Sequence, residues 1–196
     1  MQLDTREDPT IPPFGFVIDY LTYGGLYREV WLEATAESRL TDLFVYTPTL
    51  QEAVVQWTAE LTPAAAAVRI RLETAEGTLL AEQTAPVAET GKMQLSVPEA
   101  QPWDTEHPVL HHAIAELLNA AGQPIDRKQV TFGFRTAEFR ADGFYLNGKK
   151  TFLRGLNRHQ SYPYIGYAAP ESLQREDARI LQEELHCTCL LYTSPS

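Results

Sequence analysis

The sequence has few cysteines and a shortage of basic residues, and both exclude classes of protein. Its 196 residues include two cysteines, Cys187 and Cys189, whose spacing suits neither an ordinary disulfide nor a four-ligand zinc site. Lys and Arg total 16 against 26 Asp and Glu, so the net charge of −10 would repel nucleic-acid phosphates and anionic lipids. We therefore expect no nucleic-acid partner and no membrane partner.

Long hydrophobic runs and targeting signals are also missing. No apolar stretch approaches the roughly 20 residues that cross a bilayer, and the N-terminal residues lack the basic and apolar regions of a signal peptide. The sequence contains no GxSxG, HExxH, P-loop or GxGxxG motif, so several common enzyme chemistries have no support. These absences predict a soluble, cytoplasmic protein.

What is present predicts mainly β-structure. Short runs rich in β-branched and aromatic residues are separated by turn residues and occupy 26–34, 43–46, 54–61, 68–74, 78–84, 92–97, 109–118 and 129–135. Gly77 and Gly122 fall in two of the predicted turns. About seven strands at this spacing predict a β-sandwich of about 100 residues.

The segments on either side of the sandwich predict parts of other folds. Residues 143–153 predict a hairpin that turns at Asn147-Gly148. Residues 170–185 predict one amphipathic helix, with Pro170 at its first position and an apolar stripe of leucine and isoleucine. The residues before Leu26 are rich in proline and glycine and predict no compact unit of their own.

Two stretches resemble glycoside hydrolase family 2, and most of all its β-galactosidases. One is IPPFGFVIDYLTYGGLYREVWL at 11–32; the other, 132–185, contains FGFR, DGFYLNGKK and LRGLNRHQSYPYIGYA. Trp103-Asp104 and Glu106-His107-Pro108 resemble a further family signature, LW..E.P.LY, although Pro102 and His111 stand at its Leu and Tyr positions.

The resemblance implies a division of the chain into four parts. Residues 1–31 would end a sugar-binding jelly-roll domain, 32–137 would form an immunoglobulin-like β-sandwich, and 138–188 would begin the catalytic (β/α)8 barrel, the TIM barrel. Residues 189–196, CLLYTSPS, depart from the family and resemble one reading frame of a sequencing-library adapter. We expect this tail to be non-native and the chain to be an internal fragment of a longer protein.

The resemblance also implies an activity and a set of substrate-binding residues. The parent would be a retaining exo-glycosidase that removes terminal non-reducing β-D-galactose from β-galactosides. His159 would hydrogen-bond a galactose hydroxyl, because a neutral imidazole offers one donor and one acceptor. Asn157 and Arg158 are weaker candidates, and the alternative for Arg158 is a structural ion pair. The acid/base and nucleophile glutamates of the family lie beyond residue 196, so we expect the fragment to be inactive.

Other functions stay open at this stage. NRHQSYPYIGYA favours a β-galactosidase, with a β-glucuronidase as the alternative within the family. Outside the family, the alternative is a non-catalytic carbohydrate-binding or adhesion sandwich, although such a module has no need of the strand and helix after residue 153. The resemblance implies Mg²⁺ or Na⁺ near the site and a homo-oligomer in the full-length parent.

The histidines and tryptophans of the sandwich predict no further site. No Cys, Asp or Glu completes a close ligand set with His107, His111 and His112, so we do not expect a metal there. We expect Trp31, Trp57 and Trp103 in the hydrophobic core rather than as platforms for sugar stacking.

Overall fold

The computed structural model describes residues 4, 25, 26, 28–159 and 162–193, and the chain divides into two units. The larger unit is Glu33–Phe152; the smaller combines Met1–Leu32 with Leu153–Ser196. The resemblance at residues 11–24, and most of the part predicted to end a jelly-roll domain, lie outside the described residues.

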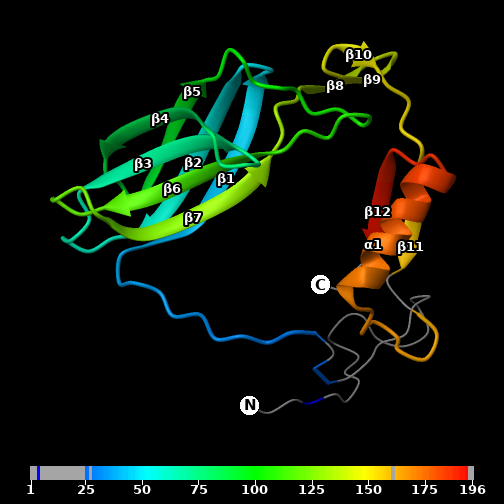
Figure 1. Ribbon diagram of the computed structural model, residues 1–196, viewed down its shortest axis with the longest axis horizontal. Helices are drawn as coiled ribbons and strands as arrows, with labels where there is room; N and C mark the ends of the chain where they lie inside the picture. The colour runs from blue at the N-terminus through cyan, green and yellow to red at the C-terminus, as the bar shows by residue number, and fades with distance from the viewer. Residues whose placement is uncertain (1–3, 5–24, 27, 160–161, 194–196) are drawn as a thin grey trace. The chain divides into compact units, whose positions relative to one another are not determined.

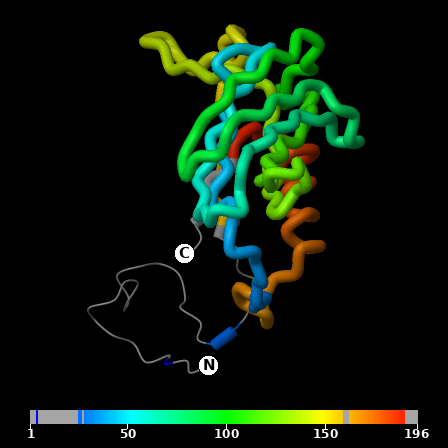
Figure 2. The backbone as a smooth tube through the Cα atoms, turned by 90° about the vertical axis from the view of Figure 1, so that its left-hand side faces the viewer, coloured from blue at the N-terminus to red at the C-terminus, as the bar shows by residue number. Residues whose placement is uncertain are grey.

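Seven strands of the larger unit form two antiparallel sheets, which lie face to face (Figures 1 and 2). The three-stranded sheet has the order β1-β2-β5 and consists of β1 (Arg39–Thr49), β2 (Glu52–Glu60) and β5 (Thr90–Ser96). The four-stranded sheet has the order β4-β3-β6-β7 and consists of β3 (Ala67–Thr74), β4 (Leu79–Pro86), β6 (His111–Leu118) and β7 (Pro124–Phe132). The predicted mainly-β sandwich is confirmed.

The core lies between the two sheets and is built by the alternation of side chains along each strand. In β3, for example, Val68, Ile70 and Leu72 are fully buried, while Arg69 and Arg71 point to the other face. The same alternation in the other strands adds a set of buried apolar side chains from both sheets: Ala53, Val55, Trp57, Met93, Leu95, Ala113, Ala115 and Leu117. Phe134, which follows β7, joins this core.

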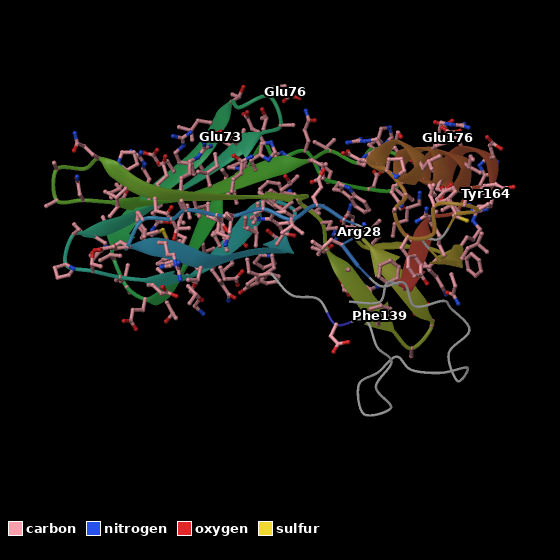
Figure 3. All side chains as sticks on the ribbon, turned by 90° about the horizontal axis from the view of Figure 1, so that it is seen from below. Arg28, Glu73, Glu76, Phe139, Tyr164 and Glu176 are labelled. Carbon is pink, nitrogen blue, oxygen red and sulfur yellow. The ribbon has the colours of Figure 1, made fainter. Side chains whose placement is uncertain are left out.

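The outer face of the four-stranded sheet is covered by ion pairs. Glu116 is buried on β6 and accepts hydrogen bonds from Arg69 Nε at 2.8 Å and Nη2 at 2.6 Å. Arg71 pairs in the same way with Glu73, which Figure 3 labels on β3. These pairs satisfy the charges that the sheet half buries.

Two predicted turns occur at their predicted places. Gly77 has φ +88° and closes the β3–β4 hairpin. The turn at Asn147-Gly148 joins β9 (Gly143–Leu146) to β10 (Lys149–Lys150), and both of its central residues have positive φ, 52° and 76°. That conformation is the one two-residue hairpin turns need, and Asn-Gly tolerates it best.

A short strand, β8 (Ala137–Arg140), pairs with β9 and completes a small sheet of three strands within the larger unit. Its two faces differ in chemistry. Phe139 lies against Phe144 on one face with ring centroids 5.1 Å apart, and Phe139 is labelled on this hairpin in Figure 3. On the other face the Arg140 guanidinium lies 3.9 Å from the centroid of the Tyr145 ring.

The smaller unit contains a strand, a helix and a second strand that runs parallel to the first. These elements are β11 (Gly155–His159), α1 (Glu171–Arg179), the π-helical turn η2 (Ile180–Glu184) and β12 (Cys189–Thr193). The predicted single helix over 170–185 is therefore an α-helix followed by a π-helical turn, and Pro170 is its N-cap rather than its first helical residue. No helix in the described ranges has the length and apolarity needed to cross a bilayer.

Two sequence predictions are wrong in detail. Leu26 and residues 28–34 are not in a strand, and Trp31 is 74% exposed rather than in the core. Alternation alone does not make a strand, because a strand also needs a paired neighbour.

The predicted non-native tail contains the strand β12, which no sequence pattern had indicated. Main-chain pairing does not depend on the origin of the residues, so the non-native origin of 189–196 stays a prediction.

Candidate functional site

Strand β11 carries the three residues predicted to bind substrate. Its partner β12 places Asn157 opposite Leu191, Arg158 opposite Tyr192 and His159 opposite Thr193. The backbone of His159 belongs to the strand, whereas its side chain lies outside the described part of the structure. The two side chains that are described, at 157 and 158, have different environments.

Arg158 anchors helix α1 to strand β11. Its Nε donates to Asp177 Oδ2 at 2.7 Å, its Nη1 donates to Gln174 Oε1 at 2.7 Å, and its Nη2 also pairs with Asp177. The Arg158 side chain is 10% exposed. Burial lowers the pKa of Arg158, but hydrogen bonds to Asp177 and Tyr162 outweigh burial and raise the pKa above its ordinary value. The Arg158 guanidinium therefore forms an ion pair with Asp177, which matches the structural role given above as the alternative for this residue.

Asp177 is held in its charged form by the same contacts. Burial raises the pKa of the Asp177 carboxyl, but its interactions with the Tyr162 hydroxyl and the Arg158 guanidinium more than compensate and leave the pKa below its usual value. The Tyr162 hydroxyl donates to the Leu173 carbonyl oxygen at 3.3 Å. The loop after β11 and the helix are therefore joined at one polar cluster.

Asn157 lies on the opposite face of the strand from Arg158, because successive side chains of a strand alternate. Its side chain is exposed, and no other described residue hydrogen-bonds it. Its amide is therefore available to a ligand, with two N–H donors and one carbonyl acceptor.

A second cluster joins the motifs that carry the family resemblance, and sequence reasoning missed it. Asn147 Oδ1 accepts from the Thr136 N–H at 2.9 Å, and Asn147 Nδ2 donates to the Trp103 carbonyl oxygen at 3.0 Å. The Trp103 N–H donates to the Phe134 carbonyl oxygen at 2.8 Å. Residues of the WD, FGFR and LNGK motifs thus meet at one place in the larger unit.

The glycine of FGFR makes this junction compact. A Cβ on Gly133 would lie 2.6 Å from Trp103 Cβ, which is closer than side chains can approach. The Arg135 guanidinium lies 4.7 Å from the centroid of the same ring, within the range of a cation–π interaction. The junction is built by packing and main-chain hydrogen bonds, so these motifs specify the fold. The signal that could have revealed it is the glycine between two aromatic residues.

The histidines of the sandwich lie in different environments, since His107 is exposed and His111 is buried. His111 is 2% exposed and lies between two phenylalanine rings, with centroids 5.0 Å from Phe134 and 5.9 Å from Phe132. Burial lowers its pKa below the ordinary histidine value. Within the described ranges, no three His, Cys, Asp or Glu side chains are grouped as metal ligands, so the residues described do not fit the Mg²⁺ or Na⁺ that the resemblance implies.

Comparison with known families assigns the chain to a class of enzyme. The model of the glycosyl hydrolases family 2 matches residues 38–135, which are half of the chain and include the whole sandwich. The chain therefore belongs to glycosyl hydrolase family 2.

Individual relatives cover most of this chain. A β-galactosidase of Thermoanaerobacter pseudethanolicus is 36% identical over 94% of the chain, and a putative β-glucuronidase of Formosa agariphila is 31% identical over 93%. The matches take up 26% and 23% of those proteins, so the chain spans about a quarter of the length of these relatives.

Solved structures show the same fold. β-Glucuronidase 3 of Bacteroides uniformis is 27% identical with a TM-score of 0.72, and the match covers 85% of this chain and 21% of that one. A Bifidobacterium dentium β-glucuronidase is 25% identical with a TM-score of 0.69, and the match covers 78% and 26%. The sequence motifs and the fold thus lead to one family.

Proposed function

We propose that the chain is part of a retaining exo-glycosidase whose substrates are β-galactosides with a terminal non-reducing β-D-galactose. The observation that carries the proposal is the identity of 36% to a β-galactosidase along nearly the whole chain, including the RGLNRH strand. The sequence NRHQSYPYIGYA supports galactose over glucuronate. Hydrolysis of β-glucuronides is the second candidate activity, because the chain is also 31% identical to a putative β-glucuronidase.

We propose that residues 138–188 begin a catalytic barrel, and the smaller unit supports this for the part from Leu153 onward. The strand β11 followed by the helix α1 is the repeating unit of a (β/α)8 barrel, and active sites lie at the carboxyl ends of the strands. Arg158 fixes the helix to one face of β11, and positions 157 and 159 share the opposite face. We propose that Asn157 and His159 hydrogen-bond hydroxyls of the galactose, while Arg158 positions the strand.

The two catalytic carboxyl groups belong to the rest of the parent in this proposal. A retaining mechanism needs an acid/base and a nucleophile about 5 Å apart. By resemblance, both are glutamates downstream of residue 196. We further propose that residues 1–31 end a jelly-roll domain and that the parent is a homo-oligomer, as the family resemblance implies.

The test uses the full-length parent and a pair of chromogenic substrates. A nitrophenyl β-galactoside should be hydrolysed at least tenfold faster than the matching β-glucuronide; the reverse ratio would support the second candidate. His159→Ala should lower kcat/KM for the galactoside by about an order of magnitude or more, the effect of about 1.4 kcal/mol of lost transition-state binding.

A matched histidine variant controls for folding and general charge effects. His107 lies in the sandwich with a side chain 75% exposed, so His107→Ala should leave kcat/KM unchanged. If His159→Ala matched wild type while folding normally, the substrate-binding role of His159 would be lost, although the assignment of the activity would stand.

A further inference from the structure

The outer face of the three-stranded sheet exposes aromatic rings beside polar side chains. Strand register places Phe44 of β1 opposite Gln56 of β2, which in turn lies opposite Lys92 of β5. Phe44 is 55% exposed and Tyr46 is 41% exposed, and their ring centroids are 6.2 Å apart. Two neighbouring rings therefore form an apolar strip along β1.

A shallow depression of about 370 Å³ opens beside this strip. Its lining residues are Asp42, Phe44, Gln56, Trp57, Thr58, Thr90, Gly91 and Lys92. No hydrogen bond or ion pair with another described residue engages five of these side chains: Asp42, Gln56, Thr58, Thr90 and Lys92. A carboxylate, an amide, two hydroxyls and an ammonium group are thus available to a ligand.

Several other polar side chains of the sandwich are paired with one another. In the next part of the same face, Gln94 Nε2 donates to Glu52 Oε1 at 2.9 Å. On the outer face of the other sheet, Arg69 is paired with Glu116 and Arg71 with Glu73. The depression differs from both because its polar groups surround an exposed ring without pairing among themselves.

We propose that this depression binds a neutral saccharide chain. The C–H face of a pyranose stacks on an aromatic ring, and amide, carboxylate and hydroxyl groups hydrogen-bond the sugar hydroxyls. The single acidic and single basic side chain, Asp42 and Lys92, offset each other and favour an uncharged ligand. The depression is shallow and open. It therefore suits a saccharide chain that lies across the sheet better than a single sugar, which would need an enclosed pocket.

This site would hold a polysaccharide chain by its surface. The binding proposal rests on the proposed function in one respect only, the choice of a galactose oligomer as the probe. Binding at a few hydrogen bonds and one or two rings is expected to be weak, with Kd on the order of 1 mM.

The experiment measures binding of β-1,4-linked galactotetraose to the 196-residue chain by NMR titration. We expect amide shifts in three stretches of the three-stranded sheet: 42–46, 56–58 and 90–92. Phe44→Leu, which keeps an apolar side chain but removes the ring, should weaken binding about tenfold, and Gln56→Ala several-fold. The matched control is Phe139→Leu, since Phe139 is 85% exposed on the β8–β9 hairpin and should not matter.

Three outcomes would overturn the proposal. They are the absence of shifts at 10 mM galactotetraose, stronger binding of a uronic-acid oligosaccharide than of galactotetraose, and shifts at Phe44 that follow protein concentration instead of sugar. The last would identify a second copy of the chain as the occupant. Hydrolysis is measured on the full-length parent with a small chromogenic galactoside, which Phe44→Leu should leave unaffected. Failure of binding therefore leaves the proposed activity intact, and failure of hydrolysis leaves the binding site intact.

Discussion

Single residues decide how tightly the sandwich packs around its tryptophans. Trp57 is buried, and its Nε1 donates to the Ala88 carbonyl oxygen at 3.1 Å. Gly91 lies directly opposite on β5, where any side chain would overlap the indole ring. The bare backbone at position 91 therefore allows the largest side chain of β2 to enter the core.

Gly91→Val should lower the free energy of unfolding by about 3 kcal/mol, because the Trp57 ring must leave its place and lose its hydrogen bond. Urea denaturation followed by tryptophan fluorescence measures the change. Ser96→Val, at an exposed position of the same strand, should alter the free energy by less than about 0.5 kcal/mol. Equal stability of the Gly91 variant and wild type would show that the ring packs differently.

His111 should make the sandwich sensitive to mild acid. Its folded-state pKa is lowered by burial, so below the ordinary value of 6.5 the unfolded chain takes up a proton that the folded chain resists. This contribution to stability is therefore expected to be fully present well above pH 6.5 and to be lost progressively as the pH falls through and below that value.

His111→Phe, which suits a site between Phe132 and Phe134, should flatten this part of the profile. Melting temperatures above and below pH 6.5 provide the measurement. His107→Ala should retain the wild-type slope, since that side chain is exposed. A slope unchanged in the His111 variant would assign the acid sensitivity to other groups.

At the scale of elements, the Arg158 guanidinium links β11 to α1. Arg158→Ala should leave the Asp177 carboxylate without its cationic partner in a partly buried place, and the helix should loosen from the strand. Hydrogen–deuterium exchange should become faster in 171–184, while the exchange of β3 and β6 in the other unit should not change. Arg175→Ala is the control, because its ion pair with Glu171 is more than three-quarters exposed and should contribute little.

Local patterns predicted most strands and turns, and distant contacts explain what they missed. The alternation of buried and exposed side chains in β3 and the Asn147-Gly148 turn each depend on residues that are adjacent in the sequence, so both were predictable. Residues 29–34 have a strand-like pattern but form no strand, so that pattern gave a wrong prediction.

The same reasoning applies to the candidate site. RGLNRH indicated the strand that carries residues 157–159, but the partner of Arg158 lies 19 positions away, on the helix. The bond between Asn147 and Trp103 spans 44 positions, and no local pattern contains it. Only the fold brings such residues together.

At the scale of the whole molecule, we expect this 196-residue chain to show no turnover of β-galactosides. A retaining glycosidase needs two carboxyl groups about 5 Å apart, and by resemblance these belong to a part of the parent beyond residue 196. The purified chain should match the buffer blank with a chromogenic β-galactoside, beside a full-length relative at equal concentration. Steady turnover that survives repurification would place the catalytic carboxylates within this chain.

The hydrogen bonds of Asn147 also bear on how the protein ages. In an Asn-Gly pair, the glycine nitrogen can attack the side-chain carbonyl carbon, expel ammonia and form an imide, which water opens to aspartate or isoaspartate. Folding opposes this reaction, because both ends of the Asn147 amide are held, by the Thr136 N–H and the Trp103 carbonyl. Unfolding removes that protection. The aspartate that forms has no side-chain N–H, so it cannot restore the hydrogen bond to the Trp103 carbonyl oxygen. Deamidation would then turn a reversible unfolding event into a permanent one.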